Sequence, residues 1–285
     1  MDLELKGKRA FISGSTKGIG FAIAKTLVKE GAEVIINGGS KSTVDDALKR
    51  IKETINDAEV TGVACDFSSP EEVKSLIENV GEVDILINNA GIITKDLILT
   101  KEGIETQFAV NYIAPFLLSH LLLDCLKKNS PSRIINTGTI AHASGNLNSN
   151  DFQGNEKKYR GFSGIYGDTK LALTIFTIEM AKKLKGTGVT CNVIHPGVVN
   201  TNLGRNVFPK ILYEILFRPI SKVFALSSKK GAEPIIKAAI SNEFDNINGN
   251  YYKRFKNLKP SKKVFDENLN ERLWNYTIEL TQLTR

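Results

Sequence analysis

A glycine-rich segment near the N-terminus limits the folds open to this chain. The apolar run at residues 9–13 leads into Gly14-Ser15-Thr16-Lys17-Gly18-Ile19-Gly20, and apolar residues then recur at helical spacing. A strand, a glycine turn and a helix in this order are typical of dinucleotide-binding units. The glycines admit a pyrophosphate close to the backbone, and the helix N-terminus offers N–H donors. The spacing lacks the Gly-Lys-Ser/Thr ending of an ATPase loop, and glycines in an ordinary turn are the alternative.

Short apolar runs alternate with segments of helical periodicity as far as residue 201. Residues 83–87 are nearly all apolar, as expected of a parallel strand that is covered on both faces. The alternation predicts an α/β fold with a single doubly wound, Rossmann-type parallel sheet and helices on both faces. We expect one domain over residues 1–285. Its further strands are predicted at residues 31–37, 60–65, 83–87, 133–136 and 190–194.

Metal chemistry finds little support in the composition. The three cysteines, Cys65, Cys125 and Cys191, are far apart in the sequence, which argues against a disulfide framework or a zinc site. We therefore expect no bound metal. His195 follows the strand at residues 190–194 without a ligand partner in view, so we expect a structural role for it.

Location and charge exclude two further classes. No apolar run reaches the length of a membrane span, and the N-terminus lacks the apolar core of a signal peptide, so we expect a cytoplasmic location. Much of the basic excess behind the net charge of +7 lies after residue 252. No zinc-finger or RNA-recognition motif accompanies these lysines, so we expect a solvated basic face and no nucleic-acid partner.

Tyr166 and Lys170 stand four positions apart at the start of an apolar-periodic run. On a helix they lie on one face, one above the other. A lysine ammonium beside a tyrosine hydroxyl favours the phenolate and lowers the phenol pKa from its usual value of roughly 10. Such a phenol passes a proton to or from an alcohol or carbonyl oxygen near neutral pH. The alternative is a surface helix that carries both residues without using them.

Two further candidates lie at a strand end and inside a helix. Thr139 follows the strand at residues 133–136 and offers a hydroxyl at the edge where open α/β sheets place their sites. Asn111 lies in a long apolar helix predicted over residues 104–126. Pro115 cannot donate to the Asn111 carbonyl, which leaves that carbonyl free to hold a water. A kinked core helix is the alternative.

The residues after the second predicted strand bear on the cofactor. A carboxylate there accepts hydrogen bonds from the adenine ribose hydroxyls of NAD, whereas a cation binds a 2′-phosphate. The chain has Gly38-Gly39-Ser40-Lys41 and no acid, and Lys17 and Lys41 are both placed to reach a 2′-phosphate. This pattern favours NADP(H), with NAD as the alternative. Asp66, after the third strand, either touches the adenine or caps the helix that begins near Ser69.

Taken in order, these motifs resemble those of the short-chain dehydrogenase/reductase family, and the resemblance covers nearly the whole chain. It is carried by Gly14-x-x-x-Gly18-x-Gly20, Asn88-Asn89-Ala90-Gly91, Asn111, Tyr166-x-x-x-Lys170, and Pro196-Gly197 with Thr201. Within the family the sequence looks like the retinol dehydrogenase branch. That likeness is carried by residues 131–136, 184–190 and 195–199, and by Ala141-His142, Leu203-Gly204-Arg205 and Arg272-Leu273-Trp274.

The resemblance implies an oxidoreductase that interconverts an alcohol and a carbonyl by hydride exchange with a nicotinamide. Tyr166 would exchange the proton, and Lys170 would lower the Tyr166 pKa and bind the nicotinamide ribose. Thr139 would bind the substrate oxygen, and Asn111 would hold a relay water. The implied cofactor contacts come from the glycine segment, the strand ends and the catalytic pair: Gly14, Ser15, Thr16, Lys17, Gly18, Ile19, Gly20, Asn37, Asp66, Phe67, Asn89, Ala90, Gly91, Tyr166, Lys170, Val199 and Thr201.

The sequence departs from the family pattern at two places. The family usually has serine where this chain has Thr139, and the added methyl fixes χ1 and narrows the pocket. The interval between Thr139 and Tyr166 is also long. It contains a polar stretch at residues 146–160, which the retinol dehydrogenase branch shares.

Residues 207–217 are unusually apolar, and the resemblance implies a C-terminal substrate lid at about residues 202–228. We therefore expect a hydrophobic carbonyl or alcohol as substrate, such as an aliphatic, isoprenoid, aromatic or steroid-like compound. Packing of this segment on a partner subunit or on a membrane surface, as a peripheral contact, is the alternative, and we expect a homo-oligomer. A catalytically silent nucleotide-binding sensor of the same fold is the alternative function, but the intact Tyr166/Lys170 pair argues against it.

Overall fold

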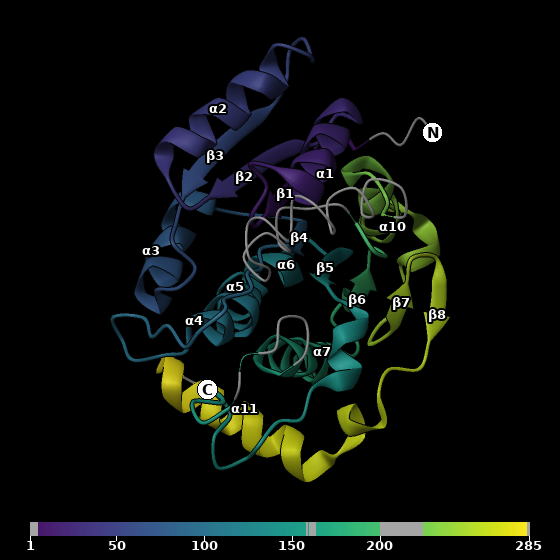
Figure 1. The fold of residues 1–285 in the computed structure, drawn as a ribbon. Coiled ribbons are helices and arrows are strands. Elements are labelled where there is room, and N and C mark those ends of the chain that lie inside the picture. The colour runs from purple at the N-terminus through teal and green to yellow at the C-terminus, as the bar shows by residue number, and fades with distance from the viewer. Residues whose placement is uncertain (1–4, 158, 160–163, 200–224, 284–285) are drawn as a thin grey trace.

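The fold is built on one eight-stranded sheet in the order β3-β2-β1-β4-β5-β6-β7-β8 (Figure 1). The computed structural model describes residues 5–157, 159, 164–199 and 225–283. All neighbouring strands are parallel except β7 and β8. The predicted doubly wound α/β class is therefore confirmed. The strands are β1 Arg9–Ile12, β2 Glu33–Gly38, β3 Val60–Ala64, β4 Ile85–Asn88, β5 Ser132–Thr137, β6 Val189–His195, β7 Tyr251–Lys253 and β8 Lys256–Leu258.

Helices cover both faces of the sheet. Apolar side chains of α1, α2 and α10 pack on one face, and those of α3, α5 and α7 pack on the other. The helices and shorter helical turns are α1 Gly18–Lys29, α2 Lys41–Lys52, α3 Pro70–Val80, α4 Thr106–Phe108, η1 Ala109–Ile113, α5 Ala114–Leu121, α6 Leu123–Lys128, η2 Ile140–Ser144, α7 Ile165–Lys183, α10 Ser228–Ile240, η5 Asn242–Phe244, η6 Lys262–Phe265 and α11 Glu267–Thr281. None of the helices within the described ranges is both long and apolar enough to cross a membrane.

The single long helix predicted over residues 104–126 is in fact divided. Glu105 caps its first turn, with Oε2 accepting from the Phe108 N–H at 2.6 Å. The helix then widens to the π turn η1, returns to α geometry at α5, and breaks at Leu122 before α6. Pro115 stands in the first turn of α5, where a missing N–H is tolerated. The π turn contains Asn111, and π turns inside α-helices are frequent at functional sites.

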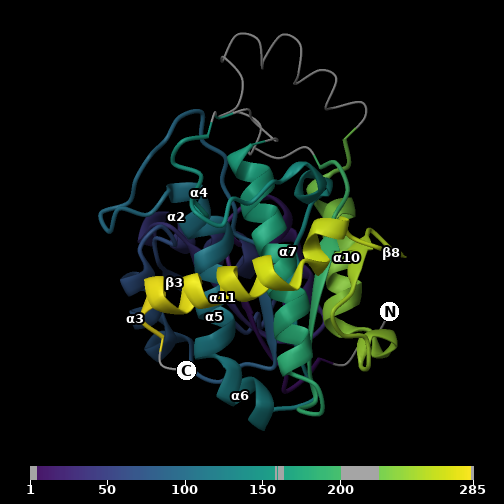
Figure 2. The ribbon, with the colours of Figure 1, turned by 90° about the horizontal axis from the view of Figure 1, so that it is seen from below.

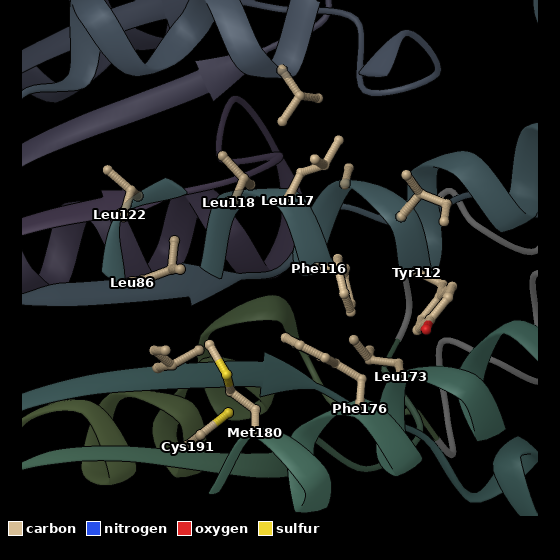
Figure 3. Close-up of a cluster of buried hydrophobic side chains, with 14 of the residues drawn as sticks. Leu86, Tyr112, Phe116, Leu117, Leu118, Leu122, Leu173, Phe176, Met180 and Cys191 are labelled. Atoms are coloured by element: carbon tan, nitrogen blue, oxygen red, sulfur yellow. The ribbon is translucent and has the colours of Figure 1, made fainter. Parts of the chain in front are cut away.

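Aromatic packing fixes α5 against α7 (Figure 3). The Phe116 ring lies 5.1 Å from that of Phe176 and 5.2 Å from that of Trp274 in α11, between ring centroids. Tyr112 bonds to Thr277 through their hydroxyls at 2.7 Å. The C-terminal helix α11 therefore crosses over α5 and α7 and holds them together (Figure 2).

A chain of buried amides joins the central strands to α7. Asn88 Nδ2 donates to Asn136 Oδ1 at 2.8 Å, and Asn136 Nδ2 donates to Thr177 Oγ1 at 2.8 Å. Buried amides that donate to one another in this way favour one arrangement of their neighbours. The carboxyl ends of β4 and β5 are thereby held in a set position relative to the helix that carries Tyr166 and Lys170.

Candidate active site

The carboxyl ends of the central strands bring the predicted site residues together. The glycine segment leaves β1, Asn89 follows β4, Thr139 follows β5, and α7 begins beside them. The two neighbours β1 and β4 are parallel and in register at Ile12 and Ile87, so the loops that follow them meet.

The glycine segment is packed tightly against the end of β4. Gly14 has a φ of +60°, and a Cβ added there would lie 2.8 Å from the Ala90 Cα. A Cβ on Gly20 would lie 2.4 Å from the Gly14 carbonyl oxygen. Asn89 Nδ2 donates to the Gly14 carbonyl at 3.0 Å and to the Ser13 carbonyl at 3.1 Å. No larger residue fits at Gly14 or Gly20 without moving this backbone.

Ser15 and Asn37, both predicted to contact the cofactor, have side chains bound inside the protein. Ser15 Oγ donates to the Ile12 carbonyl at 2.7 Å and accepts from the Asn37 N–H at 2.8 Å. Asn37 Oδ1 accepts from the Gly14 N–H at 3.0 Å, and its Nδ2 donates to the Val63 carbonyl at 3.3 Å. Both are fully buried, so their side chains hold the glycine segment in shape.

The N-terminus of α1 is suited to a pyrophosphate. Lys17 occupies the N-cap position without a side-chain hydrogen bond, and the first turn contains no acid. The first N–H groups of a helix have no partner within it, and they carry positive dipole. Gly18 has a φ of +63°, and a Cβ there would meet nothing within 4 Å. The backbone here is open, so these residues fit the phosphates of a dinucleotide.

Tyr166 and Lys170 lie in the first turns of α7, and both are only 5% exposed. Lys170 Nζ donates to the Thr137 carbonyl at 3.1 Å and lies 6.0 Å from the centroid of the Tyr166 ring. A Cβ added to Gly91 would lie 3.3 Å from Asn111 Oδ1 and 3.7 Å from Lys170 Nζ. Gly91, Asn111 and Lys170 are therefore neighbours, one turn of α7 after Tyr166.

Burial sets the protonation of this pair. It lowers the pKa of Lys170 to about 8, and it raises the pKa of the Tyr166 hydroxyl. Desolvation is the cause of the raised Tyr166 pKa, and the Lys170 ammonium donates to the Thr137 carbonyl. The predicted lowering of the Tyr166 pKa by Lys170 stays a prediction.

Thr139 and Asn111 differ in how far their side chains are hydrogen-bonded within the protein. Thr139 Oγ1 accepts from the Ala141 N–H at 3.3 Å, and its hydroxyl hydrogen has no acceptor among the residues that the structure describes. The Asn111 side chain is fully bonded: Oδ1 accepts from the Ile92 N–H at 2.8 Å. Its Nδ2 donates to the Ile92 carbonyl at 3.0 Å and to Thr169 Oγ1 at 3.1 Å. Asn111 thus joins the β4 loop to α7, and its relay water stays a prediction.

The remaining predicted cofactor contacts surround this centre. Asp66 does not cap α3: Ser69 is the N-cap, and Asp66 Oδ1 accepts from the Ser68 N–H at 2.9 Å. The capping alternative is wrong, and the Asp66 carboxylate stays exposed beside the buried Phe67. Val199 is half-buried and forms a parallel bridge with Leu226.

Part of the predicted site lies outside the described residues. Thr201 and the lid at residues 202–228 fall there, except for residues 225–228. Lys41 is described, and its Nζ pairs with Asp45 Oδ2 at 2.6 Å on the outside of α2. Such an exposed pair is weak and open to exchange with another anion. His195 is buried, its Nδ1 accepts from the Gly197 N–H at 3.4 Å, and burial lowers its pKa to about 4.

Two contacts near the site were not predicted. Arg50 of α2 donates from Nη2 to the Thr16 carbonyl of the glycine segment at 3.3 Å, with its Cζ 4.0 Å from the Phe21 ring centroid. Asp168, nearly fully buried between Tyr166 and Lys170, pairs with Lys157 of the polar stretch. The sequence signal for the second contact was an acid inside the Tyr-x-x-x-Lys spacing, next to an insertion that carries a lysine.

The fold and this site together define a dinucleotide-binding enzyme of the Rossmann type. The family model described as short chain dehydrogenase matches residues 8–211. The chain belongs to the short-chain dehydrogenase family, whose members act on alcohol or carbonyl groups with NAD(P). The predicted family is confirmed.

Curated relatives and solved structures agree with this assignment. Retinol dehydrogenase 12 of Mus musculus is 34% identical over 283 residues, which cover 98% of this chain and 88% of that protein. Polyprenol dehydrogenase of Homo sapiens is 33% identical over 289 residues, covering 95% and 84%. A crystal structure of an uncharacterized protein from Mycobacterium Paratuberculosis superposes with a TM-score of 0.77 at 23% identity, covering 98% and 95% of the two chains, and supports the fold alone. The predicted likeness to retinol dehydrogenases is thus confirmed.

Proposed function

We propose that the protein is an NADP(H)-dependent oxidoreductase that interconverts an alcohol and a carbonyl on a hydrophobic small molecule. The observation that carries this proposal is the burial of Tyr166 and Lys170 on one helix face, beside Gly91 and Asn111, at the sheet edge where the uncapped N-terminus of α1 lies. A bound nicotinamide supplies or accepts the hydride.

The chain's own residues handle the proton. Tyr166 gives a proton to the carbonyl oxygen in the reducing direction, or takes one from the alcohol in the oxidising direction. Thr139 donates its free hydroxyl hydrogen to the same oxygen and orients it. Lys170, with a pKa of about 8, would hold the nicotinamide ribose through Nζ and place its charge near the phenol. Its charge then favours the phenolate, which burial alone disfavours.

A hydrophobic substrate is supported by the loops around the site. Leu97, Ile98 and Leu99 follow β4, Ile140 follows β5, and Val198 follows β6, and all five are exposed. Exposed apolar groups gathered at one end of a protein mark a binding surface. Retinol and polyprenol, the alcohols in the names of two relatives, are both isoprenoid, so we propose an isoprenoid or similar long-chain alcohol or aldehyde.

The preference for NADP(H) rests on the end of β2. Gly38 and Gly39 provide no acid that would repel a 2′-phosphate, and Lys17 is exposed beside the open Gly18 backbone. Oxidation of NADPH and of NADH, followed by absorbance with retinal and with a long-chain aldehyde, tests the proposal. We expect turnover with NADPH that Tyr166→Phe lowers by about 10²–10⁴-fold while NADPH still binds. NADPH binding without turnover on any aldehyde of the panel favours the silent sensor instead.

A further inference from the structure

The segment at residues 251–265, named here the C-terminal hairpin, exposes apolar and cationic side chains side by side. It comprises β7, a turn, β8 and η6. Phe255, Leu258 and Phe265 are 49%, 42% and 56% exposed. The segment contains no Asp or Glu, and its six cations are Lys253, Arg254, Lys256, Lys259, Lys262 and Lys263.

Within the part of the chain that the structure describes, most of these cations lack an ion-pair partner. Arg254 is 3.9 Å from Glu233, and Lys263 donates to the Gly145 carbonyl at 2.6 Å. The other four lysines are exposed and form no ion pair with any residue in the described ranges. Lysines on an edge strand discourage pairing with another sheet, which accounts for the charges. It does not account for three large apolar side chains in the same exposed segment.

The hairpin turn lies at the same edge of the sheet as the candidate active site. Strand β7 is parallel to β6, with Lys253 opposite His195, so the turn follows at the carboxyl edge. The Arg254 N–H donates to the His195 carbonyl at 2.7 Å, and a Cβ on Gly197 would lie 3.4 Å from Arg254 Cδ. The turn is thus two strands away from Thr139, which follows β5, at the outer edge of the sheet (Figure 1).

We propose that the C-terminal hairpin docks this enzyme on a membrane surface rich in anionic phospholipid. Phe255, Leu258 and Phe265 enter the boundary between headgroups and acyl chains, and the unpaired lysines lie against the lipid phosphates. Docking through the turn at Phe255 brings the carboxyl edge of the sheet near the bilayer. In that respect the inference builds on the proposed hydrophobic substrate, whereas the docking itself requires no turnover.

Two other occupants of this surface are less favoured. Antiparallel pairing of β8 with β8 of a second copy would set Lys256 and Lys259 of one chain beside those of the other, and like charges opposite each other destabilise a sheet. A nucleic acid would neutralise the lysines but offers no apolar phase for Leu258 and Phe265. An anionic bilayer satisfies both the charge and the apolar groups.

The test is flotation of the full chain, without cofactor or substrate, with vesicles of phosphatidylcholine alone or mixed with phosphatidylserine. We expect binding to the mixed vesicles only, falling as salt is raised. Each lysine near such a surface contributes roughly fivefold. Lys256→Gln with Lys259→Gln should therefore weaken binding by more than about tenfold. Phe255→Ser with Leu258→Ser should weaken binding to the mixed vesicles by a similar factor. We expect this loss even at low salt, where the attraction of the lysines is strongest.

The matched control is Lys29→Gln with Lys52→Gln, two exposed lysines in the last turns of α1 and α2, which should leave binding unchanged. The thermal midpoint of each variant checks that it is folded. The proposal is overturned by equal binding to neutral vesicles, by no binding to either kind, or by an equal loss in the control. It is also overturned by a dimer in sedimentation velocity that Phe255→Ser dissociates, or by duplex DNA binding tighter than vesicle binding. The assay measures no turnover, so its failure is distinct from failure of the proposed oxidoreductase.

Discussion

Asp168, in the first turn of α7, is joined by an ion pair to Lys157 of the polar stretch. Asp168 Oδ1 accepts from the Asn146 N–H at 2.6 Å, and its Oδ2 pairs with Lys157 Nζ, which also donates to the Asn146 carbonyl. Asp168 stands midway between Tyr166 and Lys170 on α7. The ion pair therefore fixes the polar stretch to the turn of helix that carries the proposed proton donor.

Lys157→Ala should destabilise the protein and slow turnover. It leaves the buried Asp168 carboxylate without its cation, and an unsatisfied buried group costs about 1–3 kcal/mol, with more for a charge. Chemical denaturation gives the loss in unfolding free energy. Because Lys157 contacts neither the glycine segment nor the proposed substrate oxygen, we expect kcat to fall with little change in NADPH affinity.

The control for this pair lies on the same helix. Lys182 pairs with Glu179 at 2.8 Å near the exposed end of α7, so Lys182→Ala should cost no more than about 1 kcal/mol. Lys157→Arg should keep most of the stability that Lys157→Ala loses, because the positive charge is retained. Equal losses for Lys157→Ala and Lys182→Ala would show that the Asp168 pair is an ordinary surface pair.

Lys170→Met should lower both kcat and NADPH affinity, because it removes the proposed charge near the phenol and the proposed ribose ligand. An NADPH dissociation constant equal to that of the parent would show that Lys170 does not bind the ribose. The variant also has a signature in stability. Burial lowers the pKa of Lys170 from 10.5 to about 8, so the cost of its charge is fully present below pH 8. That cost is relieved as the pH rises toward 10.5, and the stability gap between variant and parent should narrow there.

The positions of strands β1 to β6 and the doubly wound class of the sheet were predictable, because apolar runs and glycine spacing are local signals. Strands β7 and β8 were not predicted, since each has three residues and their sequence is rich in lysine. The bond from Lys170 to the Thr137 carbonyl depends on how α7 packs against β5, which no spacing encodes. For the same reason Asn37 was predicted as a cofactor contact, although its amide is used within the protein.

Thr139→Ser should keep activity and alter the choice of substrate. The hydroxyl is retained, while loss of the methyl widens the pocket and frees χ1. Thr139→Ala should lose rate, because no hydroxyl remains to donate to the substrate oxygen and to accept from the Ala141 N–H. Steady-state kcat/KM over a series of aldehydes of increasing bulk separates the two effects. Parent-like kinetics for Thr139→Ala would rule out the proposed oxygen contact.

His195→Gln should make the protein less sensitive to acid. Burial lowers the pKa of His195 from 6.5 to about 4, so the folded state resists a proton that the unfolded chain binds. Stability is therefore lost as the pH falls below 6.5, by about 2 kcal/mol at pH 5 from this group. Burial also lowers the pKa of His120 and of His142. Both therefore also destabilise the folded state in acid, but by the same amount in parent and variant. Denaturation at pH 7 and pH 5 should show a smaller loss for the variant; equal losses contradict the assignment.

The space around Gly38 and Gly39 decides where an acid can be introduced to test the cofactor preference. An acid after β2 should turn the enzyme toward NAD(H), but a Cβ on Gly38 would lie 2.5 Å from Thr16 Cγ2 and disturb the glycine segment. A Cβ on Gly39 meets nothing within 4 Å, so Gly39→Asp is the better substitution. Its carboxylate would repel a 2′-phosphate and accept from the ribose hydroxyls of NAD.

Removal of the cations should act in the same direction. A 2′-phosphate carries close to two negative charges, and each charge-assisted hydrogen bond contributes about 1.5–3 kcal/mol. Lys17→Ala should therefore reduce the ratio of kcat/KM for NADPH over NADH by roughly tenfold or more. Lys41→Ala should have a smaller effect, because Lys41 already pairs with Asp45. Lys49→Ala, which removes an exposed lysine further along α2, is the matched control and should leave the ratio unchanged. A parent enzyme that prefers NADH would contradict this account of the β2 end and leave the family assignment intact.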